Sequence, residues 1–436
     1  MHKSLLLVAI LGTPLFAQSP QPLELQTRGF ANQHQERALR HEDRIVVSFR
    51  IPAPGAALDA ALAQVGLARI ESGVMHAFEV IRVPEGMVDA WVAWFNEQPL
   101  VHYAEPVGIA YTCEEPNDPF FKPYQWNFFD KGMLSNGVAA NFGVNGVSAW
   151  NTSKGAGVTV AIVDTGIAYE NFGAFAQAPD LAGATFVAPY NFVNNTTHAN
   201  DDNGHGTHVA GTVRQSTGNA LGVAGLAHLA TLMPVKVLNS AGSGSYTAIA
   251  NGITHAANNG AHVINMSLGG SVGSTTLRNA VDYAWGAGVV IAAATGNTGR
   301  RGVSYPAAYA NCIAVVATRF DGRRAGYSTY GNGIDVVAPG GDTSVDQNND
   351  GYGDGILQQT FASGTPTSFG YYFFQGTSMA TPHVAAIAAL VKAARPAYSN
   401  SQVRNAIQSS CTDLGNSGYD TTFGFGLVNA ALALTR

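Results

Sequence analysis

Charged residues are scarce in this 436-residue chain. They make up 12% of it, against roughly a quarter in ordinary globular proteins. The formal net charge is -6, so the chain lacks the basic surface that nucleic-acid binding requires, and we expect no nucleic-acid partner. With so few charges, the surface must consist largely of Ser, Thr, Asn, Gln and Gly.

Cysteine is rare as well. The chain has three cysteines, Cys113, Cys312 and Cys411. At most one disulfide can form within the chain, and the sequence does not determine which two cysteines would pair.

Long apolar runs are limited to the N-terminus. Residues 5–16 are apolar, follow Lys3, and are too few to cross a bilayer. A positive end, an apolar stretch and a small residue, Ala17, are typical of a secretory signal peptide, which we place at residues 1–17. We therefore expect a secreted, monomeric protein with no membrane partner after export.

The next part of the chain divides into a lead-in and a small module. Residues 18–43 are polar and aperiodic, as in a flexible segment. Residues 44–112 then alternate between strand and helix patterns. Strands are predicted at residues 44–49, 69–73, 75–83 and 101–109, and helices at residues 56–65 and 86–96. This order is that of a ferredoxin-like α+β module.

From residue 155 onward, strand and helix patterns alternate regularly. Apolar runs typical of buried strands occur at residues 158–163, 232–238, 262–266, 289–294, 312–317 and 334–338. Helical patterns occur at residues 247–259, 274–287 and 379–394. The alternation predicts an α/β domain of three layers, with a parallel sheet between helices on both faces.

Three residues have the types and the chain order of a hydrolytic triad. Ser378 opens an Ala-rich apolar run, with Pro382 expected in the first helical turn, where its missing N–H costs nothing. Taken alone, Ser378 fits an ordinary N-cap equally well, but a helix N-terminus also stabilises an oxyanion. Asp164 directly follows a predicted strand, where parallel sheets bind ligands, and His205 lies in a His-Gly-Thr-His segment. Asp, His, Ser is a known order for such triads.

Five segments resemble the motifs of the subtilisin family of serine proteases, in that family's order. They are residues 164–166, 203–212, 265–270, 296–297 and 376–386. The resemblance implies that residues 113–436 are a subtilisin-like catalytic domain. It further implies an endopeptidase that hydrolyses polypeptides through an acyl-enzyme, with Ser378 as nucleophile, His205 as base and Asp164 orienting the base.

The resemblance also implies how the transition state is stabilised. Asn297 would be the side-chain donor of the oxyanion hole, and the backbone N–H of Ser378 would be the second donor. In isolation, an Asn at this place also fits a turn before Gly299.

Two glycine-rich segments resemble the strands that flank a bound peptide in this family. They are Gly242-Ser243-Gly244-Ser245-Tyr246 and Ser267-Leu268-Gly269-Gly270, and their glycines would let a peptide backbone approach as an added strand. By the same resemblance, Thr298 and Ser304 would line the pocket for the residue before the cut bond. Because neither is charged, we expect a broad specificity with a preference for apolar or aromatic residues there.

The small module at residues 44–112 resembles the propeptide of this family. The resemblance implies a zymogen whose own propeptide is its folding aid and intramolecular inhibitor. Residues 114–119 are acidic and Pro-rich, as in an exposed linker. We therefore expect maturation cleavage between Ile109 and Asn117.

Two loops predict calcium as a structural cofactor, and no cofactor is expected for catalysis. One loop places oxygen ligands at alternate positions, as in an EF-hand: Asp346, Asn348, Asp350, Tyr352 and Asp354. Its twelfth position is Leu357 instead of Glu, so a metal-free hydrophilic turn is the alternative. The resemblance adds the loop at residues 216–223, with Asn219 and backbone carbonyls as ligands.

Other functions remain open from the residues. His205 and His208 have a spacing that would let two histidines on one helix bind a metal, but the sequence shows no apparent third ligand. The Asp-Thr-Gly motif at residues 164–166 also occurs in aspartic proteases, but no second copy is present. An acid-acting enzyme of the sedolisin type would need acidic residues in place of His205 and Asn297. The residues are also compatible with an esterase on the same triad, or with a catalytically silent binding protein that keeps the fold.

Overall fold

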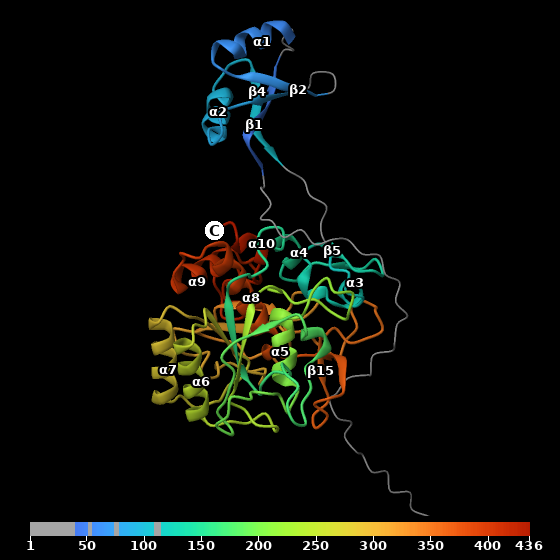
Figure 1. Ribbon diagram of the computed structural model, residues 1–436, viewed down its shortest axis with the longest axis vertical. Coiled ribbons are helices and arrows are strands. Elements are labelled where there is room, and N and C mark those ends of the chain that lie inside the picture. The colour runs from blue at the N-terminus through green and yellow to red at the C-terminus, as the bar shows by residue number, and fades with distance from the viewer. Residues whose placement is uncertain (1–39, 51–54, 74–77, 109–114) are drawn as a thin grey trace, which may run out of the picture. The chain divides into compact units, whose positions relative to one another are not determined.

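The computed structural model describes residues 40–50, 55–73, 78–108 and 115–436, which fall into two compact units (Figure 1). The expected signal peptide, residues 18–39 of the lead-in, Cys113 and the peptide bonds at 109–114 lie outside the described residues. Among the described helices, none combines the length and the apolar character needed to span a membrane.

The smaller unit has the predicted order of elements around an antiparallel sheet. Its elements are β1 (Arg40–Phe49), α1 (Gly55–Gln64), β2 (Ala68–Ser72), β3 (Glu79–Arg82), α2 (Val88–Asn96) and β4 (Val101–Gly108). The strand order is β2-β3-β1-β4. Ile45, Val47 and Ile81 point from the sheet into a core shared with the helices, as the period-two pattern requires. Strand β1 begins at Arg40, four residues before the expected start.

The larger unit contains the predicted parallel sheet. Its strands are β7 (Thr159–Asp164), β8 (Thr185–Phe186), β9 (Tyr190–Asn191), β10 (Thr231–Lys236), β11 (Val263–Met266), β12 (Val290–Ala294), β13 (Ile313–Thr318) and β14 (Val336–Pro339). They run in the order β14-β13-β12-β11-β7-β10-β8, and β9 also pairs with β10. All these pairings are parallel, and the six long strands lie within two residues of their predicted bounds.

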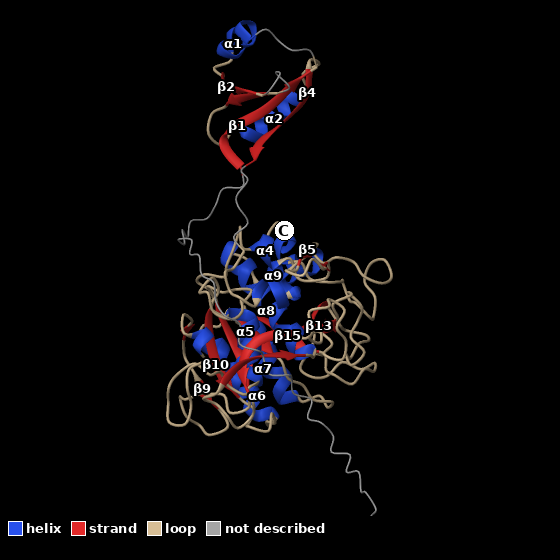
Figure 2. Ribbon diagram, turned by 90° about the vertical axis from the view of Figure 1, so that its right-hand side faces the viewer, coloured by secondary structure: helices blue, strands red, loops and turns tan. Residues whose placement is uncertain are grey.

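Helices cover both faces of this sheet, and each face has its own core (Figure 2). Val160 and Ile162 of β7 face α5 (His205–Arg214) and α8 (Thr377–Ala394). Ala161 and Val163 face α6 (Tyr246–Asn258) and α7 (Thr275–Gly286), which lie side by side in Figure 1. Both sets are apolar because a strand buried on both faces cannot alternate with polar residues.

The chain leaves β7 in one direction for β10 and later returns to its other side with β11, β12, β13 and β14. In parallel sheets, ligands bind beyond the carboxyl ends of the strands at such a reversal of strand order. Asp164 is the last residue of β7, so it lies at this point.

The remaining elements are short or were not predicted. They are α3 (Phe121–Tyr124), β5 (Gly132–Met133), β6 (Ala139–Ala140), α4 (Gly146–Ala149), β15 (Ile356–Phe361), β16 (Phe369–Phe374), α9 (Asn400–Ser409), α10 (Ala430–Ala433) and two 3₁₀ turns at Trp126–Phe128 and Pro179–Leu181. The antiparallel hairpin β15–β16 was not predicted because two buried glutamines, Gln358 and Gln359, interrupt its apolar pattern.

Candidate active site

Asp164 and His205 form a hydrogen-bonded pair. The Asp164 carboxylate is fully buried, and its Oδ1 lies 2.7 Å from Nδ1 of His205, the first residue of α5. Because the carboxylate accepts, the imidazole carries its proton on Nδ1, which leaves Nε2 able to take up a proton. Burial lowers the pKa of His205, but the charge and hydrogen bond of Asp164 and the charge of Asp201 raise it above its ordinary value overall.

Only glycine allows α5 to approach the Asp164 loop this closely. A Cβ atom on Gly206 would lie 2.1 Å from the carbonyl oxygen of Gly166 and 3.2 Å from Cβ of Asp164. The residue after His205 is therefore fixed by packing, since any side chain would push the helix and its imidazole away from Asp164.

Ser378 is the second residue of α8, and Gly376 is the N-cap. The expected place of Pro382 in the first turn was wrong, because α8 starts at Thr377 and Pro382 is its sixth residue. Pro382 has no N–H for the carbonyl of Ser378 four residues earlier. That carbonyl accepts a hydrogen bond from Oγ of Ser267 instead, at 2.8 Å.

The Ser378 hydroxyl also contacts Ser267, the residue that follows β11. Its Oγ donates to the carbonyl oxygen of Ser267 at 3.1 Å, and it makes no hydrogen bond to His205, both of which are described residues. Catalytic hydrogen bonds are often absent from ligand-free sites and form when substrate binds.

Asn297 follows β12 and is oriented by α8. Its Oδ1 accepts hydrogen bonds from the backbone N–H and from Oγ1 of Thr377, both at 2.9 Å. With its oxygen held in this way, the Nδ2 group is available to an oxygen of a bound molecule. The backbone N–H of Ser378 also has no acceptor among the described residues.

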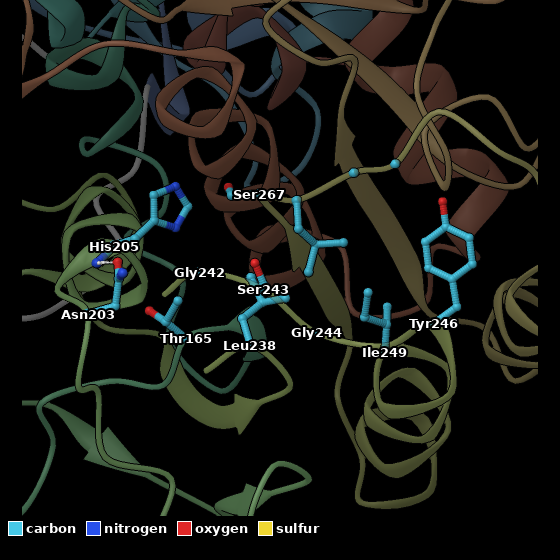
Figure 3. Close-up of a pocket in the computed structure, with 13 residues that line it drawn as sticks. Thr165, Asn203, His205, Leu238, Gly242, Ser243, Gly244, Tyr246, Ile249 and Ser267 are labelled. Atoms are coloured by element: carbon cyan, nitrogen blue, oxygen red, sulfur yellow. Dashed lines mark hydrogen bonds between the residues drawn. The ribbon is translucent and has the colours of Figure 1, made fainter. Parts of the chain in front are cut away.

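A cleft runs away from His205 between two backbone segments (Figure 3). His205 and Thr165 lie at one end of it, and Tyr246 and Ile249 of α6 lie at the other. The two segments predicted to flank a substrate line this cleft with every residue except Ser245: Gly242, Ser243, Gly244, Tyr246, Ser267, Leu268, Gly269 and Gly270. Leu238 and Ile249 line it too and were not predicted, because apolar residues on a helix or strand end are indistinguishable from core in a sequence.

Thr298 and Ser304, the other predicted substrate residues, do not line this cleft. Ser304 lies beside the backbone of two glycines: a Cβ on Gly296 would be 2.5 Å from its Oγ, and one on Gly269 would be 3.1 Å from its Cβ. Thr298 is exposed, and its Oγ1 is 3.0 Å from Oγ1 of Thr329. None of these contacts of Thr298 or Ser304 involves a charged group.

Sequence comparison identifies the family. The profile described as "Subtilase family" matches residues 155–426, which is most of the larger unit. The chain is a subtilase. A second profile, "Fervidolysin N-terminal prodomain", matches residues 31–106.

Known relatives agree with this assignment. Thermitase from Thermoactinomyces vulgaris is 39% identical over 319 residues, which cover 73% of this subtilase and 99% of thermitase. A thermophilic serine proteinase from Bacillus sp. (strain AK1) is 36% identical over 93% of this chain and 90% of its own length. Among solved structures, a protease from Pseudoalteromonas arctica PAMC 21717 superposes with a TM-score of 0.64 at 34% identity, covering 73% of this chain and 98% of that one.

These matches and the fold confirm the predicted class. The protein is a serine endopeptidase of the subtilisin family that carries an N-terminal prodomain.

A buried acidic pair in this subtilase adds to the predicted loop at residues 216–223. Burial, together with a smaller effect of the Asp118 charge, raises the pKa of Asp180 to about 7, and burial raises that of Asp118 to about 6. Asn219 donates to Oδ1 of Asp180 at 2.9 Å, and Oδ1 of Asp118 has no hydrogen-bond partner among the described residues. Two such carboxylates beside an amide offer the oxygen ligands that a hard cation such as Ca²⁺ prefers. The sequence did not reveal them because both lie far from Asn219 along the chain.

The predicted EF-hand-like loop is partly folded onto itself. Asp346 accepts from the N–H groups of Asp350 and Gly351 at 3.2 Å each, and Asp350 accepts from that of Tyr352 at 2.8 Å. Burial raises the pKa of Asp350 and of Asp354 to about 6. Oδ1 of Asp354 is buried with no hydrogen-bond partner in the described chain, although no three His, Cys, Asp or Glu side chains in the described ranges converge as a metal site.

His208 does not share a ligand with His205. Its Nε2 lies 3.0 Å and 3.1 Å from the carbonyl oxygens of Ile356 and Tyr372, so one N–H bridges both strands of the β15–β16 hairpin. The ring is stacked on Phe374 at 4.3 Å between centroids. Cys312 and Cys411 are both free thiols, so they do not form a disulfide with each other.

Proposed function

We propose that this subtilase is a secreted serine endopeptidase in which Asp164, His205 and Ser378 form the catalytic triad. The observation that carries the proposal is the 2.7 Å hydrogen bond between buried Asp164 and His205 at the end of a cleft whose wall includes Ser267, the residue bonded to Ser378.

The proposed reaction begins with the Ser378 hydroxyl. It turns from the Ser267 carbonyl to Nε2 of His205, which takes its proton as Oγ attacks the scissile carbonyl. His205 then gives that proton to the leaving amine, while Asp164 stabilises the imidazolium. Water repeats the cycle on the acyl-enzyme, releasing the acid product and restoring Ser378.

The oxyanion would be held by Nδ2 of Asn297 and by the N–H of Ser378. Support comes from the two hydrogen bonds that Thr377 donates to the Asn297 oxygen, since they fix the orientation of the amide and leave its Nδ2 group available. The positive end of the α8 dipole adds to this stabilisation.

We further propose that polypeptides bind as an added strand between residues 242–244 and 267–269, with little dependence on sequence. This mode agrees with the glycines that line both walls of the cleft. Ser304 and Thr298 would border the pocket for the residue before the cut bond. Their lack of charge favours apolar or aromatic side chains there.

We propose that the protein is made as a zymogen. Its chain would comprise a signal peptide (1–17), a lead-in (18–43), an inhibitory prodomain (44–112) and the catalytic domain (113–436). This proposal is supported by the prodomain match over residues 31–106 and by the separate core of the smaller unit. After export and cleavage between Ile109 and Asn117, we expect a soluble monomer that acts on polypeptides and binds neither membrane nor nucleic acid.

Calcium is proposed as a structural ion at Asp118, Asp180 and Asn219, and at the loop of Asp346, Asn348, Asp350, Tyr352 and Asp354. At the first site the carboxylates and backbone carbonyls would hold the ion, which would neutralise two buried charges. At the second, Tyr352 would contribute its carbonyl, since its ring packs on Phe373. The ion would supply no catalytic step.

The test compares wild type with Ser378→Ala. We expect wild type to shed the prodomain, measured by intact mass and N-terminal sequencing. We also expect its ratio of casein digestion to nitrophenyl ester hydrolysis to exceed that of an esterase. Ser378→Ala should remain full length and inactive. Equal trimming of both proteins would assign the cutting to another protease, and casein digestion by Ser378→Ala would refute the triad.

A further inference from the structure

A second carboxylate lies behind the Asp164–His205 pair. Asp201 is fully buried and accepts hydrogen bonds on both carboxylate oxygens. Oδ1 receives Oγ1 of Thr165 at 2.8 Å and the N–H groups of Asn203 and Gly204 at 2.9 and 3.0 Å. Oδ2 receives the N–H and Oγ1 of Thr207 at 2.9 and 2.7 Å.

These donors belong to the two segments that carry the catalytic pair. Asn203, Gly204 and Thr207 surround His205 at the start of α5, and Thr165 is the residue after Asp164. Oγ1 of Thr165 also accepts from the N–H of Gly206 at 2.9 Å. Asp201 therefore joins the loop of the acid to the helix of the base, with Thr165 as the shared partner.

The network continues to a buried lysine. Lys236, 1% exposed and paired with Asp164 across the β7–β10 ladder, donates to the carbonyl of Thr165 and to Oδ1 of Asp202, both at 2.6 Å. Its ammonium group has no hydrogen bond to Asp201 in the described chain. The Asp201 charge is balanced by hydrogen-bond donors and by the positive end of α5, and not by a cation.

We propose that Asp201 is a positioning residue of the protease: it fixes the imidazole of His205 against Asp164 and contributes to stabilising the imidazolium formed during catalysis. The inference rests on the proposed triad. Nothing in the sequence marks Asp201, because an Asp shortly before a helix fits an ordinary turn.

Asp201 would act on His205 in two ways that can be measured separately: by holding the imidazole in position and by its negative charge. A displacement of about 1 Å in a catalytic group can cost about 100-fold in rate, so a loosened α5 start should lower kcat without weakening substrate binding. The titratable groups that interact with His205 are Asp164 from β7, Asp201 from the preceding loop and His208 on α5 itself. Of these, Asp164 and then Asp201 raise the pKa of His205 by their charge.

The experiment measures kcat and KM against pH for the full chain after maturation. Asp201→Asn removes the charge and should lower kcat by about 10- to 100-fold, with KM within about twofold, and move the acidic limb of kcat/KM to lower pH. Thr165→Val removes the bridging hydroxyl but keeps every charge, so it should lower kcat while leaving the limb in place. The matched control is Asp335→Asn, a buried carboxylate just before β14 that accepts from Arg404, Gln408 and Ala314, and it should change neither value.

An Asp201→Asn enzyme with wild-type kcat and an unmoved acidic limb would overturn the proposal. If that variant does not fold, Thr165→Val and Thr207→Val decide, and wild-type kcat in both would equally refute it. Activity that survives in Ser378→Ala would instead defeat the proposed triad, so the two failures are distinguishable.

Discussion

Ser267 and Ser378 exchange two hydrogen bonds: Oγ of Ser267 donates to the carbonyl of Ser378 at 2.8 Å, and Oγ of Ser378 donates to the carbonyl of Ser267 at 3.1 Å. The first bond exists because Pro382 removes the helical donor of that carbonyl. The start of α8 is thus tied to the end of β11, on the wall of the cleft.

Ser267→Ala should destabilise the fold. It leaves the Ser378 carbonyl without its donor, which costs about 1–3 kcal/mol of unfolding free energy. Denaturant unfolding of the variants, made in the Ser378→Ala protein to prevent self-digestion, measures this value. The double variant Ser267→Ala/Pro382→Ala is compared with Ser267→Ala alone. Because Pro382→Ala restores a helical N–H, the double variant should recover part of the loss, and a loss that stays the same would show that the carbonyl is not its cause.

Asn297→Ala should reduce kcat by about 100- to 1,000-fold and leave KM nearly unchanged, the size of effect known for the equivalent donor in subtilisin. The proposed donor would act on charge that develops only in the transition state. Steady-state kinetics on a peptide substrate provide the measurement. Asn297→Asp is the control, since it keeps the acceptor toward Thr377 but lacks the donor, and it should be equally impaired.

Acid should destabilise the fold through two buried histidines. Burial lowers the pKa of His208 to about 3 and that of His383 to about 4, from 6.5 in the unfolded chain. Since the unfolded state binds these protons first, their contribution is complete above pH 6.5. It is lost at about 1.4 kcal/mol per pH unit for each histidine as the pH falls toward about 4.

Urea unfolding of Ser378→Ala between about pH 7 and pH 4.5 tests this slope. His208→Asn retains a donor for the hairpin but cannot be protonated, so it should show a shallower pH dependence than the parent. A slope identical to the parent's would remove His208 from the explanation.

Removal of calcium should be more damaging at high pH. The raised pKa values of Asp118 and Asp180, about 6 and about 7, mean that the folded apo protein binds protons that the unfolded chain has released. Without the ion, these groups therefore reduce stability as the pH rises from about 4 through 7, and Ca²⁺ offsets that loss by binding their ionised forms. The shift in Tm caused by EDTA should be larger at about pH 8 than at about pH 5.

The control for this prediction is Asp118→Asn in the same Tm assay. It removes a ligand charge and should shrink the EDTA effect at the higher pH. An EDTA effect that does not vary with pH in wild type would contradict the assignment of the ion to this acidic pair.

Ser304→Asp should create a preference for Lys or Arg before the cut bond. The side chain lies beside Gly269 and Gly296, so a carboxylate would enter the proposed pocket with little room to turn away. Cleavage of a peptide library by wild type and variant tests it. A dominant basic preference already present in wild type would show that the pocket is not the uncharged one proposed.

Regular elements were predictable where local patterns agree with tertiary structure. The sheet strands are buried on both faces, so their uninterrupted apolar runs indicated both their existence and their bounds. The β15–β16 hairpin could not be predicted in this way, because Gln358 and Gln359 are buried by contacts with Ala224 and Asp180 that lie far away in the chain.

In the candidate site, too, residues in local motifs were predictable and residues that depend on distant contacts were not. Asp164, His205 and Ser378 stand in short motifs whose residue types carry the chemistry. Asp201 and Asp180 do not, because each becomes part of a site only through partners brought together by folding. Pro382 was misplaced for a related reason: its tolerance depends on a hydroxyl at the end of β11 that no local pattern contains.

The close approach of Gly206 to the loop of Gly166 has a consequence for how such proteases diversify. A side chain on Gly206 would collide with the carbonyl oxygen of Gly166, and the two segments are also joined through the hydrogen bonds that Thr165 makes with Gly206 and Asp201. Chimaeras that exchange sequence between related enzymes should therefore keep residues 164–207 as one block. Crossovers inside it would combine an acid loop and a base helix that did not evolve together.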